Sequence, residues 1–366
     1  MIMDYLFIDA HEDLAYSAYT FGRDYTQSAM RIRQLEVNTD IPLHGGQSLL
    51  GWPEWQKAKC AVIIGTLFIL PKRYQSGDWE KTAYKTIAEA SVLTHWQVDY
   101  YQRLQDENPE KFRLIQTRKQ LIEHWQLWVD QSAAPSKPVG IILSMEGAEG
   151  LKDPRELEEW YARGLRLLGP VWAGTRYCGG MYEPGGFTNE GRLLLEIMAG
   201  LGMGLDITHM SEVAALEAIE RYEGPAVFAS HANCRSLLNG SGGERHLSDQ
   251  MIRYLAERDG VIGILPFNKF LVPNWTNSEP RDKVTLTHVA THIDHICQLT
   301  GNSTHAAIGT DFDGGFGYPA VPLEINTIAE IQLLAGRLEE LGYTEADIQM
   351  IFGLNWKRIL ERTLPA

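Results

Sequence analysis

Short apolar segments that alternate with helical patterns constrain the fold of this chain more than any other feature. Eight of them occur along the 366 residues, and each is typical of a buried strand. Strands that are each followed by a helix belong to a parallel sheet, so eight such units predict an α/β fold of the (β/α)8 TIM-barrel type. The segments expected to form strands are Tyr5–Ile8, Cys60–Leu70, Val139–Ser144, Leu165–Trp172, Met203–Thr208, Pro225–Ser230, Gly260–Phe267 and Ala306–Gly309.

Capping residues mark the helices expected between these strands. Asp78, Thr188 and Ser211 each precede a helical segment, as an N-cap does. No linker-like stretch interrupts the series, so a single domain over residues 1–366 is predicted. An open, doubly wound sheet is the alternative, but it normally carries a glycine-rich turn after its first strand, where this chain has His-Glu-Asp. The helices are expected at Ala29–Leu35, Trp79–Leu104, Arg118–Asp130, Pro154–Arg163, Asn189–Gly200, Glu212–Tyr222, Leu247–Arg258, Leu286–Leu299, Ile328–Leu341 and Glu345–Leu364, with a turn at Ala133–Pro138.

Charge and cysteine content narrow the class of protein. A net charge of −14 argues against nucleic acid and anionic membrane surfaces as partners. The four cysteines are widely spaced without a C-x-x-C pair, so neither a disulfide framework nor a thiolate zinc site is indicated. The first residues lack the pattern of a signal peptide, and no segment approaches membrane-spanning length. A cytoplasmic protein with no membrane partner is therefore expected.

Residues suited to binding a metal follow the predicted strands. His11 and Asp13 lie two positions apart at the end of the first strand, so their side chains point to the same face. In a (β/α)8 barrel the carboxyl ends of all strands meet at one mouth. Imidazole and carboxylate groups gathered there are typical ligands of zinc. Five of the eight strands end in such residues, which are His11 and Asp13, Glu146, His209, His231 and Asp311.

The number of these groups favours two metal ions over one. Three histidines and two carboxylates exceed the needs of one tetrahedral ion and suit a pair of ions roughly 3.5–4 Å apart that share a bridging ligand. Glu146, with two oxygens on a flexible side chain, is the expected bridge. The histidine and aspartate of the first strand are assigned to one ion, and His209 and His231 to the other. Asp311 is then free to act as the acid/base. Two divalent ions, three carboxylates and a bridging hydroxide sum to zero charge, so the hydroxide can persist at neutral pH and pass its proton through Asp311 to a leaving amine.

Each of these residues also has a structural interpretation. A lone histidine at a strand end, such as His209, is often hydrogen-bonded without a metal. Glu146 precedes Gly147 and could be a turn carboxylate, and Asp311–Gly314 is a good turn sequence in its own right. The metal interpretation is favoured because all the residues follow strands of the same direction.

Three further histidines favour packing over metal binding. His288, His292 and His295 are spaced four and three residues apart along one side of a predicted helix. They flank the apolar positions that mark its core face. Solvated or packed histidines are therefore expected there.

The segments that carry these residues resemble the zinc-dependent membrane dipeptidase (renal dipeptidase) family of amidohydrolase-like enzymes. The resemblance rests on IDAHED, SMEGAEG, GLDITHMS, VFASH and AIGTDFDG in this order, and extends to HIDHICQLTG and to GLNWKRIL near the C-terminus. It implies a (β/α)8 barrel, often a homodimer, that uses two Zn²⁺ per chain to hydrolyse dipeptides, including some with a D-residue at the C-terminal side. The membrane anchor and signal of the family find no match in this sequence.

The resemblance also implies roles for individual residues. Arg245 matches the arginine that binds the carboxylate of the substrate, a task that suits a bidentate guanidinium group. The alternative for Arg245 is a surface arginine near a helix start. By motif position, His11 and Asp13 match the ligands of one zinc ion, Glu146 the bridging ligand, His209 and His231 the ligands of the other ion, and Asp311 the catalytic acid/base.

One position departs from the family pattern. Where many members have a histidine that steadies the developing oxyanion, this sequence has Trp172, which offers one N–H donor and no positive charge. Arg176 or Tyr177 in the following loop are candidates to replace it. The loss of one oxyanion donor can cost on the order of 10²–10³ in rate.

The sequence therefore predicts a binuclear zinc hydrolase that cleaves the amide bond of dipeptides through a metal-bridging hydroxide. The first alternative is an amidohydrolase that acts on another small amide or ester because of Trp172. The second is a barrel that binds metal or peptide without turnover, which the free carboxylate of Asp311 argues against.

Overall fold

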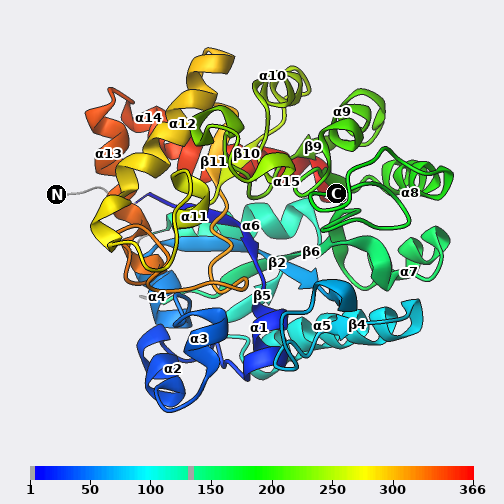
Figure 1. Ribbon diagram of the computed structural model, residues 1–366, viewed down its shortest axis with the longest axis horizontal. Coiled ribbons are helices and arrows are strands. Elements are labelled where there is room, and N and C mark those ends of the chain that lie inside the picture. The colour runs from blue at the N-terminus through cyan, green and yellow to red at the C-terminus, as the bar shows by residue number, and fades with distance from the viewer. Residues whose placement is uncertain (1–4, 131–135) are drawn as a thin grey trace.

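A parallel sheet runs through the centre of the molecule (Figure 1), and the predicted metal ligands lie on its strands or shortly after their carboxyl ends. The computed structural model describes residues 5–130 and 136–366. Six strands pair in parallel in the order in which they occur along the chain, and β5 (Phe112–Leu114) pairs additionally with β6. These strands are β1 (Phe7–Glu12), β2 (Cys60–Phe68), β6 (Val139–Glu146), β7 (Leu165–Gly169), β8 (Gly204–Asp206) and β9 (Ala226–Phe228).

Two further strands continue this order back towards β1. β10 (Ile262–Ile264) and β11 (Ala306–Ile308) pair in parallel, and a parallel bridge between Ala229 and Ile262 links the end of β9 to β10. Beyond the end of β11, the backbone N–H of Asp311 donates to the carbonyl of His11 at 3.0 Å. The sheet therefore curls so that its last strand lies beside its first, and the predicted α/β fold with eight β/α units is confirmed.

Helices surround the curled sheet, as Figure 1 shows. The strands are buried on both sides, which explains why their sequences are continuous apolar runs rather than alternating ones. Trp356 on the last helix closes one end of the core, where its indole N–H donates to the carbonyl of Ile308 at 2.9 Å. The helices are α1 (Leu14–Phe21), α2 (Ala29–Glu36), α3 (Ile41–Gly45), α4 (Trp52–Lys57), α5 (Ile87–Glu107), α6 (Arg118–Val129), α7 (Leu157–Ala162), α8 (Asn189–Gly200), α9 (Glu212–Arg221), α10 (Asp249–Glu257), α11 (Asn268–Leu271), α12 (Leu286–Thr300), α13 (Leu334–Glu340), α14 (Glu345–Gln349) and α15 (Asn355–Thr363).

The predicted start of the long helix after β2 is wrong. The helix was expected from Trp79, with Asp78 as its cap, but α5 begins at Ile87. Thr86 is the cap, because its side chain accepts a hydrogen bond from the N–H of Glu89. Between β2 and α5 the chain instead forms β3 (Leu70–Pro71), a short 3-10 turn over Lys72–Tyr74, and β4 (Ala83–Tyr84). The predicted turn at Ala133–Pro138 falls partly outside the described residues.

Within residues 5–130 and 136–366, none of the helices combines the length and the apolar character that crossing a bilayer requires.

Candidate metal centre

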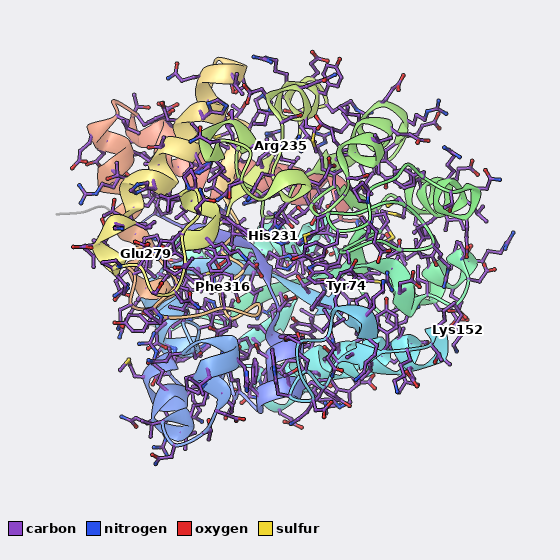
Figure 2. All side chains as sticks on the ribbon, in the orientation of Figure 1. Tyr74, Lys152, His231, Arg235, Glu279 and Phe316 are labelled. Atoms are coloured by element: carbon purple, nitrogen blue, oxygen red, sulfur yellow. The ribbon has the colours of Figure 1, made fainter. Side chains whose placement is uncertain are left out.

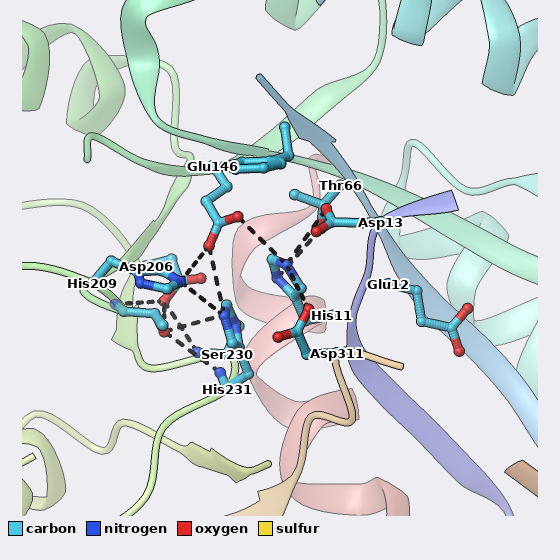
Figure 3. Close-up of polar contacts among 12 residues, drawn as sticks. His11, Glu12, Asp13, Thr66, Glu146, Asp206, His209, Ser230, His231 and Asp311 are labelled. Atoms are coloured by element: carbon cyan, nitrogen blue, oxygen red, sulfur yellow. Dashed lines mark hydrogen bonds and ion pairs between the residues drawn. The ribbon is translucent and has the colours of Figure 1, made fainter. Parts of the chain in front are cut away.

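The histidines and carboxylates predicted from the sequence meet at the carboxyl ends of the strands. His231 lies near the centre of the molecule in the view of Figure 2, and Figure 3 shows the other members of the cluster around it. His11 belongs to β1 and Glu146 is the last residue of β6. Three overlapping sets of side chains bring their ligand atoms within 4.8 Å of one another, and together they comprise His11, Asp13, Glu146, His209, His231 and Asp311.

Glu146 presents one carboxylate oxygen to each side of the cluster. Its Oε2 lies 3.8 Å from His11 Nε2, which is itself 3.6 Å from Asp13 Oδ1. Its Oε1 lies 2.6 Å from His209 Nε2 and 3.6 Å from His231 Nε2. The two oxygens thus face two different groups of ligands, which is the arrangement that a bridging carboxylate requires.

Several ligand atoms of the cluster lack the partners that buried polar atoms normally have. His11 Nε2 and Asp13 Oδ1 are buried and make no hydrogen bond. His209 Nε2 and His231 Nε2 face one another at 3.0 Å, although each imidazole has only one N–H to donate when it is neutral. Unpaired buried polar atoms are costly and rare. Convergence of such atoms on one point fits a bound cation, so the donor set present here suits a metal centre.

Burial controls the protonation of these histidines. Burial lowers the pKa of His209 and of His231 well below the usual value, and the positive charges of Arg245 and His11 lower both further. These two imidazoles are therefore neutral and have a lone pair available for a metal. Burial also lowers the pKa of His11, but the carboxylates of Glu146 and Asp13 outweigh it and raise that pKa to about 10.

Burial has the opposite effect on the pKa of the carboxylic acids in the cluster. Burial raises the pKa of Glu146 well above its usual value, and burial together with Asp13 raises the pKa of Asp311 to about 8. The cluster thus concentrates negative charge that needs either protons or cations to be stable. Divalent ions supply that positive charge without protonating the ligands.

Side chains outside the cluster orient the three imidazoles through their second ring nitrogens. His11 Nδ1 lies 3.3 Å from Thr66 Oγ1, and His231 Nδ1 lies 2.8 Å from Ser230 Oγ. His209 Nδ1 contacts the sulfur of Met181 at 3.2 Å. Fixing one ring nitrogen leaves the other aimed at the cluster.

A buried aspartate joins the two strand ends that carry His209 and His231. Asp206 Oδ1 accepts hydrogen bonds from the N–H of Thr208 at 2.9 Å and from the N–H of Ser230 at 3.0 Å. These orienting residues were not predicted from the sequence. The hydroxyl of Ser230 directly before His231, and Asp206 three residues before His209, are the only local signals for them.

The turn that carries Asp311 is held in a strained backbone conformation. Asp311 and Asp313 have φ values of 52° and 64°, in the left-handed region that costs non-glycine residues free energy. Asp313 holds the turn in place because its carboxylate accepts hydrogen bonds from Leu49 N–H at 2.8 Å and from the Ser48 hydroxyl at 2.7 Å. Asp311 Oδ1 is thereby placed 3.9 Å from His11 Nε2.

The structure places Arg245 next to the metal cluster. Its side chain is buried, its Nη1 makes no hydrogen bond, and its guanidinium carbon lies 5.2 Å from the centre of the Phe270 ring. Burial lowers the pKa of Arg245, whereas the nearby carboxylates of Asp311 and Glu146 raise it. A buried guanidinium group with an unused donor beside the cluster is suited to bind an anionic group of a ligand.

Trp172 also lies beside the cluster, but Arg176 and Tyr177 are engaged elsewhere. The ring of Trp172 is 6.2 Å from that of His209. Arg176 pairs with Glu149 and with Glu190, and its guanidinium also reaches the Tyr177 hydroxyl.

The three helix histidines follow the packing interpretation. His292 is buried and its Nδ1 accepts a hydrogen bond from the N–H of Cys234 at 3.1 Å. His295 Nε2 lies 2.9 Å from Asp249 Oδ1. None of His288, His292 and His295 takes part in a metal-ligand group among the described residues.

Solved structures share this fold over the full chain. A dipeptidase described as a metallopeptidase of family M19 matches with a TM-score of 0.77 and 21% identity, covering 100% of both chains. A metallopeptidase from Rhodobacter sphaeroides, solved with a phosphinate mimic of the dipeptide L-Ala-D-Ala, matches with a TM-score of 0.76 and 20% identity over 99% of this chain and 100% of that one.

Sequence comparison identifies the family. A protein of Klebsiella pneumoniae, described as an uncharacterized protein in the pqqA 5′ region, is 31% identical over 66% of this chain and 92% of its own length. The dipeptidase verJ of Clonostachys rogersoniana is 23% identical over 80% of this chain and 69% of its own length. The family model for membrane dipeptidases, peptidase family M19, matches residues 2–364, which confirms the resemblance predicted from the motifs. The chain therefore belongs to the membrane dipeptidase family of metallopeptidases.

Proposed function

We propose that this chain is a binuclear zinc dipeptidase that hydrolyses the amide bond of dipeptides, including dipeptides with a D-residue at the C-terminal side. The observation that carries the proposal is Glu146, which directs its two oxygens at two separate groups of ligands. A single-metal hydrolase has no use for such an arrangement.

The proposed ligands form two sets around Glu146. His11 and Asp13 hold one Zn²⁺, and His209 and His231 hold the other. The two ions would supply Lewis-acid polarisation of the scissile carbonyl and an activated water.

Asp311 is the proposed acid/base. It lies beside His11 and His231, and the two proposed ligand sets, His11 with Asp13 and His209 with His231 around Glu146, do not include it. Its carboxylate is therefore free to hold the proton released by the attacking water and to deliver it to the nitrogen of the leaving amino acid. The hydrogen-bonded turn around Asp313 keeps Asp311 in position throughout the reaction.

Arg245 is proposed to bind the free C-terminal carboxylate of the dipeptide. Its unused Nη1 and its buried position allow a charge-assisted hydrogen bond that excludes water. A peptide fixed at this end presents its last amide bond to the metal cluster, and in a dipeptide this is the only amide bond. The phosphinate dipeptide mimic bound by the Rhodobacter relative supports this substrate class.

Trp172 favours one alternative. Its ring lies beside His209, where many family members are expected to have a histidine, and an indole stabilises an oxyanion less well. A hydrolase of other small amides or esters, built on the same metal centre, is therefore the second candidate.

Turnover of zinc-reconstituted protein on a panel of dipeptides tests the proposal. The panel contains L- and D-residues at the second position, and the metal content is measured in the same samples. Cleavage well above a metal-stripped control is expected. Two bound zinc ions without cleavage of any dipeptide would refute the dipeptidase assignment and favour the second candidate.

A single domain over residues 1–366, a cytoplasmic location and a homodimer stay predictions from the sequence.

A further inference from the structure

Three aromatic rings from two loops stand together beside the metal cluster, and we call them the aromatic wall. Tyr74 comes from the turn after β3, whereas Trp172 and Tyr182 come from the glycine-rich segment after β7. The ring centres of Tyr74 and Tyr182 are 5.2 Å apart, and the ring centre of Trp172 lies 5.9 Å from Tyr74 and 5.5 Å from Tyr182. Figure 2 labels Tyr74 to one side of His231, which lies near the centre of the molecule.

Hydrogen bonds to Glu183 connect the two loops of the wall. Its carboxylate accepts hydrogen bonds from the Tyr74 hydroxyl at 2.8 Å and from Arg73 Nε at 2.5 Å. Arg73 also donates from Nη2 to the carbonyl of Gly174 at 2.9 Å, which fastens it to the start of the second loop. The rings are thus held by polar contacts outside the wall as well as by their own stacking.

The glycines of the second loop allow it to fold compactly. A Cβ atom on Gly180 would lie 2.6 Å from Val171 Cγ2 and 2.7 Å from the carbonyl oxygens of Trp172 and Ala173. Only glycine allows the loop to fold back this closely. Hydrogen bonds from the N–H groups of Tyr182 and Glu183 to the Ala173 carbonyl complete the hairpin. Tyr182 is therefore presented on a rigid support.

Tyr182 is exposed despite this support. Its side chain is 58% exposed, and its hydroxyl makes no hydrogen bond to any part of the chain that the structure describes. Behind the wall, Phe68 packs on Trp172 with ring centres 5.5 Å apart and is itself 7% exposed. A large ring that is fixed by its neighbours yet open to solvent beside a reactive cluster is suited to contact a ligand.

The wall lies near both the metal cluster and Arg245. Trp172 is 6.2 Å from His209, and Met181, next to Tyr182, touches the same histidine through its sulfur at 3.2 Å. Tyr182 also interacts electrostatically with Arg245. Burial lowers the pKa of the Arg245 guanidinium group, and Tyr182 is among the groups that raise this pKa. The side chain of a residue whose carboxylate binds Arg245 is therefore close to the wall.

The charges around the wall determine which side chain it accepts. Arg73 and Arg245 are both cationic and disfavour a basic side chain, whereas the carboxylate of Glu183 can only accept hydrogen bonds and repels an acidic side chain. The exposed faces of the rings are apolar, and stacking on them favours another ring.

We propose that Tyr74, Trp172 and Tyr182 select dipeptides whose C-terminal residue carries an aromatic side chain, which stacks on this wall while its carboxylate binds Arg245. This inference rests on the proposed function, since it requires a dipeptide held by Arg245 at the metal centre.

The first test compares Ala-Phe, Ala-Gly and Ala-Lys as substrates of the zinc-loaded protein. The wild type is expected to have a kcat/KM on the order of tenfold higher for Ala-Phe than for Ala-Gly, mainly through a lower KM. Tyr182→Ala is expected to abolish most of this ratio. Tyr254→Ala removes a comparably exposed tyrosine on α10, and is the matched control that should leave the ratio unchanged. An equal or higher kcat/KM for Ala-Gly or Ala-Lys overturns the inference but leaves the dipeptidase assignment intact.

A binding measurement tests the wall independently of turnover. Free phenylalanine and free alanine, each in L- and D-form, are titrated into the zinc-loaded protein by calorimetry. One enantiomer of phenylalanine is expected to bind on the order of tenfold more tightly than alanine, and Tyr182→Ala should remove the difference. If the protein hydrolyses no dipeptide but still shows this difference, the proposed function fails, whereas the binding of an aromatic side chain by the wall is supported. If phenylalanine and alanine bind equally, the wall is refuted whatever the turnover.

Discussion

Replacement of Glu146 by glutamine is the sharpest test of the two-metal arrangement. In the structure, Oε1 of Glu146 faces His209 and His231, and Oε2 faces His11. An amide keeps the size of the side chain but replaces one ligand oxygen by an N–H₂ donor, which repels a cation and cannot bridge. Glu146→Gln is therefore expected to bind one zinc ion at most, because only one of the two ligand groups keeps its oxygen.

The magnitude of the effect on stability follows from ligand linkage. At a free zinc concentration about 100 times the dissociation constant, each occupied site stabilises the folded state by about 2.7 kcal/mol. Loss of one of two sites should remove about that amount, and loss of both should remove about twice as much. Without metal, the substitution should cost little or stabilise, because it removes a buried acid whose pKa burial raises well above its usual value.

The assay measures zinc content, thermal unfolding with and without zinc, and dipeptide turnover. Glu149→Gln is the matched control, since Glu149 lies three residues further along and pairs with Arg176 outside the cluster. The control should keep two zinc ions and its zinc-dependent rise in unfolding temperature. Two zinc ions and undiminished turnover in Glu146→Gln would refute the bridging role.

Three further predictions concern the proton carrier, the orientation of a ligand and the acid stability of the fold. Asp311→Asn should lower kcat by a factor on the order of 10²–10⁴ while both zinc ions remain bound, because the amide cannot accept the proton; stopped assays and metal analysis check this. Ser230→Ala removes the hydroxyl 2.8 Å from His231 Nδ1, and should weaken zinc binding about 10–100-fold in a competitive chelator titration. Burial lowers the pKa of His124 to about 4. Between pH of about 6.5 and about 4, this side chain therefore stays neutral in the folded protein but is protonated in the unfolded chain. The free energy of unfolding should therefore fall by up to about 3 kcal/mol between these pH values, and denaturant titrations should show a weaker pH dependence in His124→Gln.

Each of these predictions has a control and a contrary result. Asp294→Asn on α12 changes a carboxylate outside the cluster, which accepts a hydrogen bond from the Tyr343 hydroxyl, and should keep full turnover. Equal turnover in Asp311→Asn would remove its acid/base role. An unchanged zinc affinity in Ser230→Ala would mean that packing alone orients His231. The control for the acid-stability prediction is His44→Gln on α3, which replaces a partly exposed histidine. The prediction for His124 fails if its substitution changes the pH dependence no more than the control does.

The cluster was predictable because it depends on regular geometry. His11 lies on β1 and Asp13 directly after its end, and the two side chains point to the same side, as the alternation of a strand predicts. The parallel direction of the strands then brings Glu146, His209 and His231 to the same edge of the sheet, as the structure shows. Both steps use only the strands, their direction and the few residues that directly follow them.

The features that were missed depend on loops and on competing caps. Thr86 rather than Asp78 caps α5, because the side chain of Thr86 accepts a hydrogen bond from the N–H of Glu89. The contact between Met181 and His209 depends on the close return of the chain at Gly180, and no periodicity of the sequence describes that path. The position of Tyr182 could not be inferred for the same reason.

The tight folding of the glycine-rich loop has a consequence for how this enzyme can change during evolution or in the laboratory. Substitutions at Gly179 or Gly180 would push the backbone against Gly185 or Trp172, so the path of the loop tolerates little variation. Changes in substrate choice are therefore accessible chiefly through the side chains that the loop displays, Tyr182 first among them because it contacts solvent. Libraries for new substrates should randomise that ring and leave the glycines untouched.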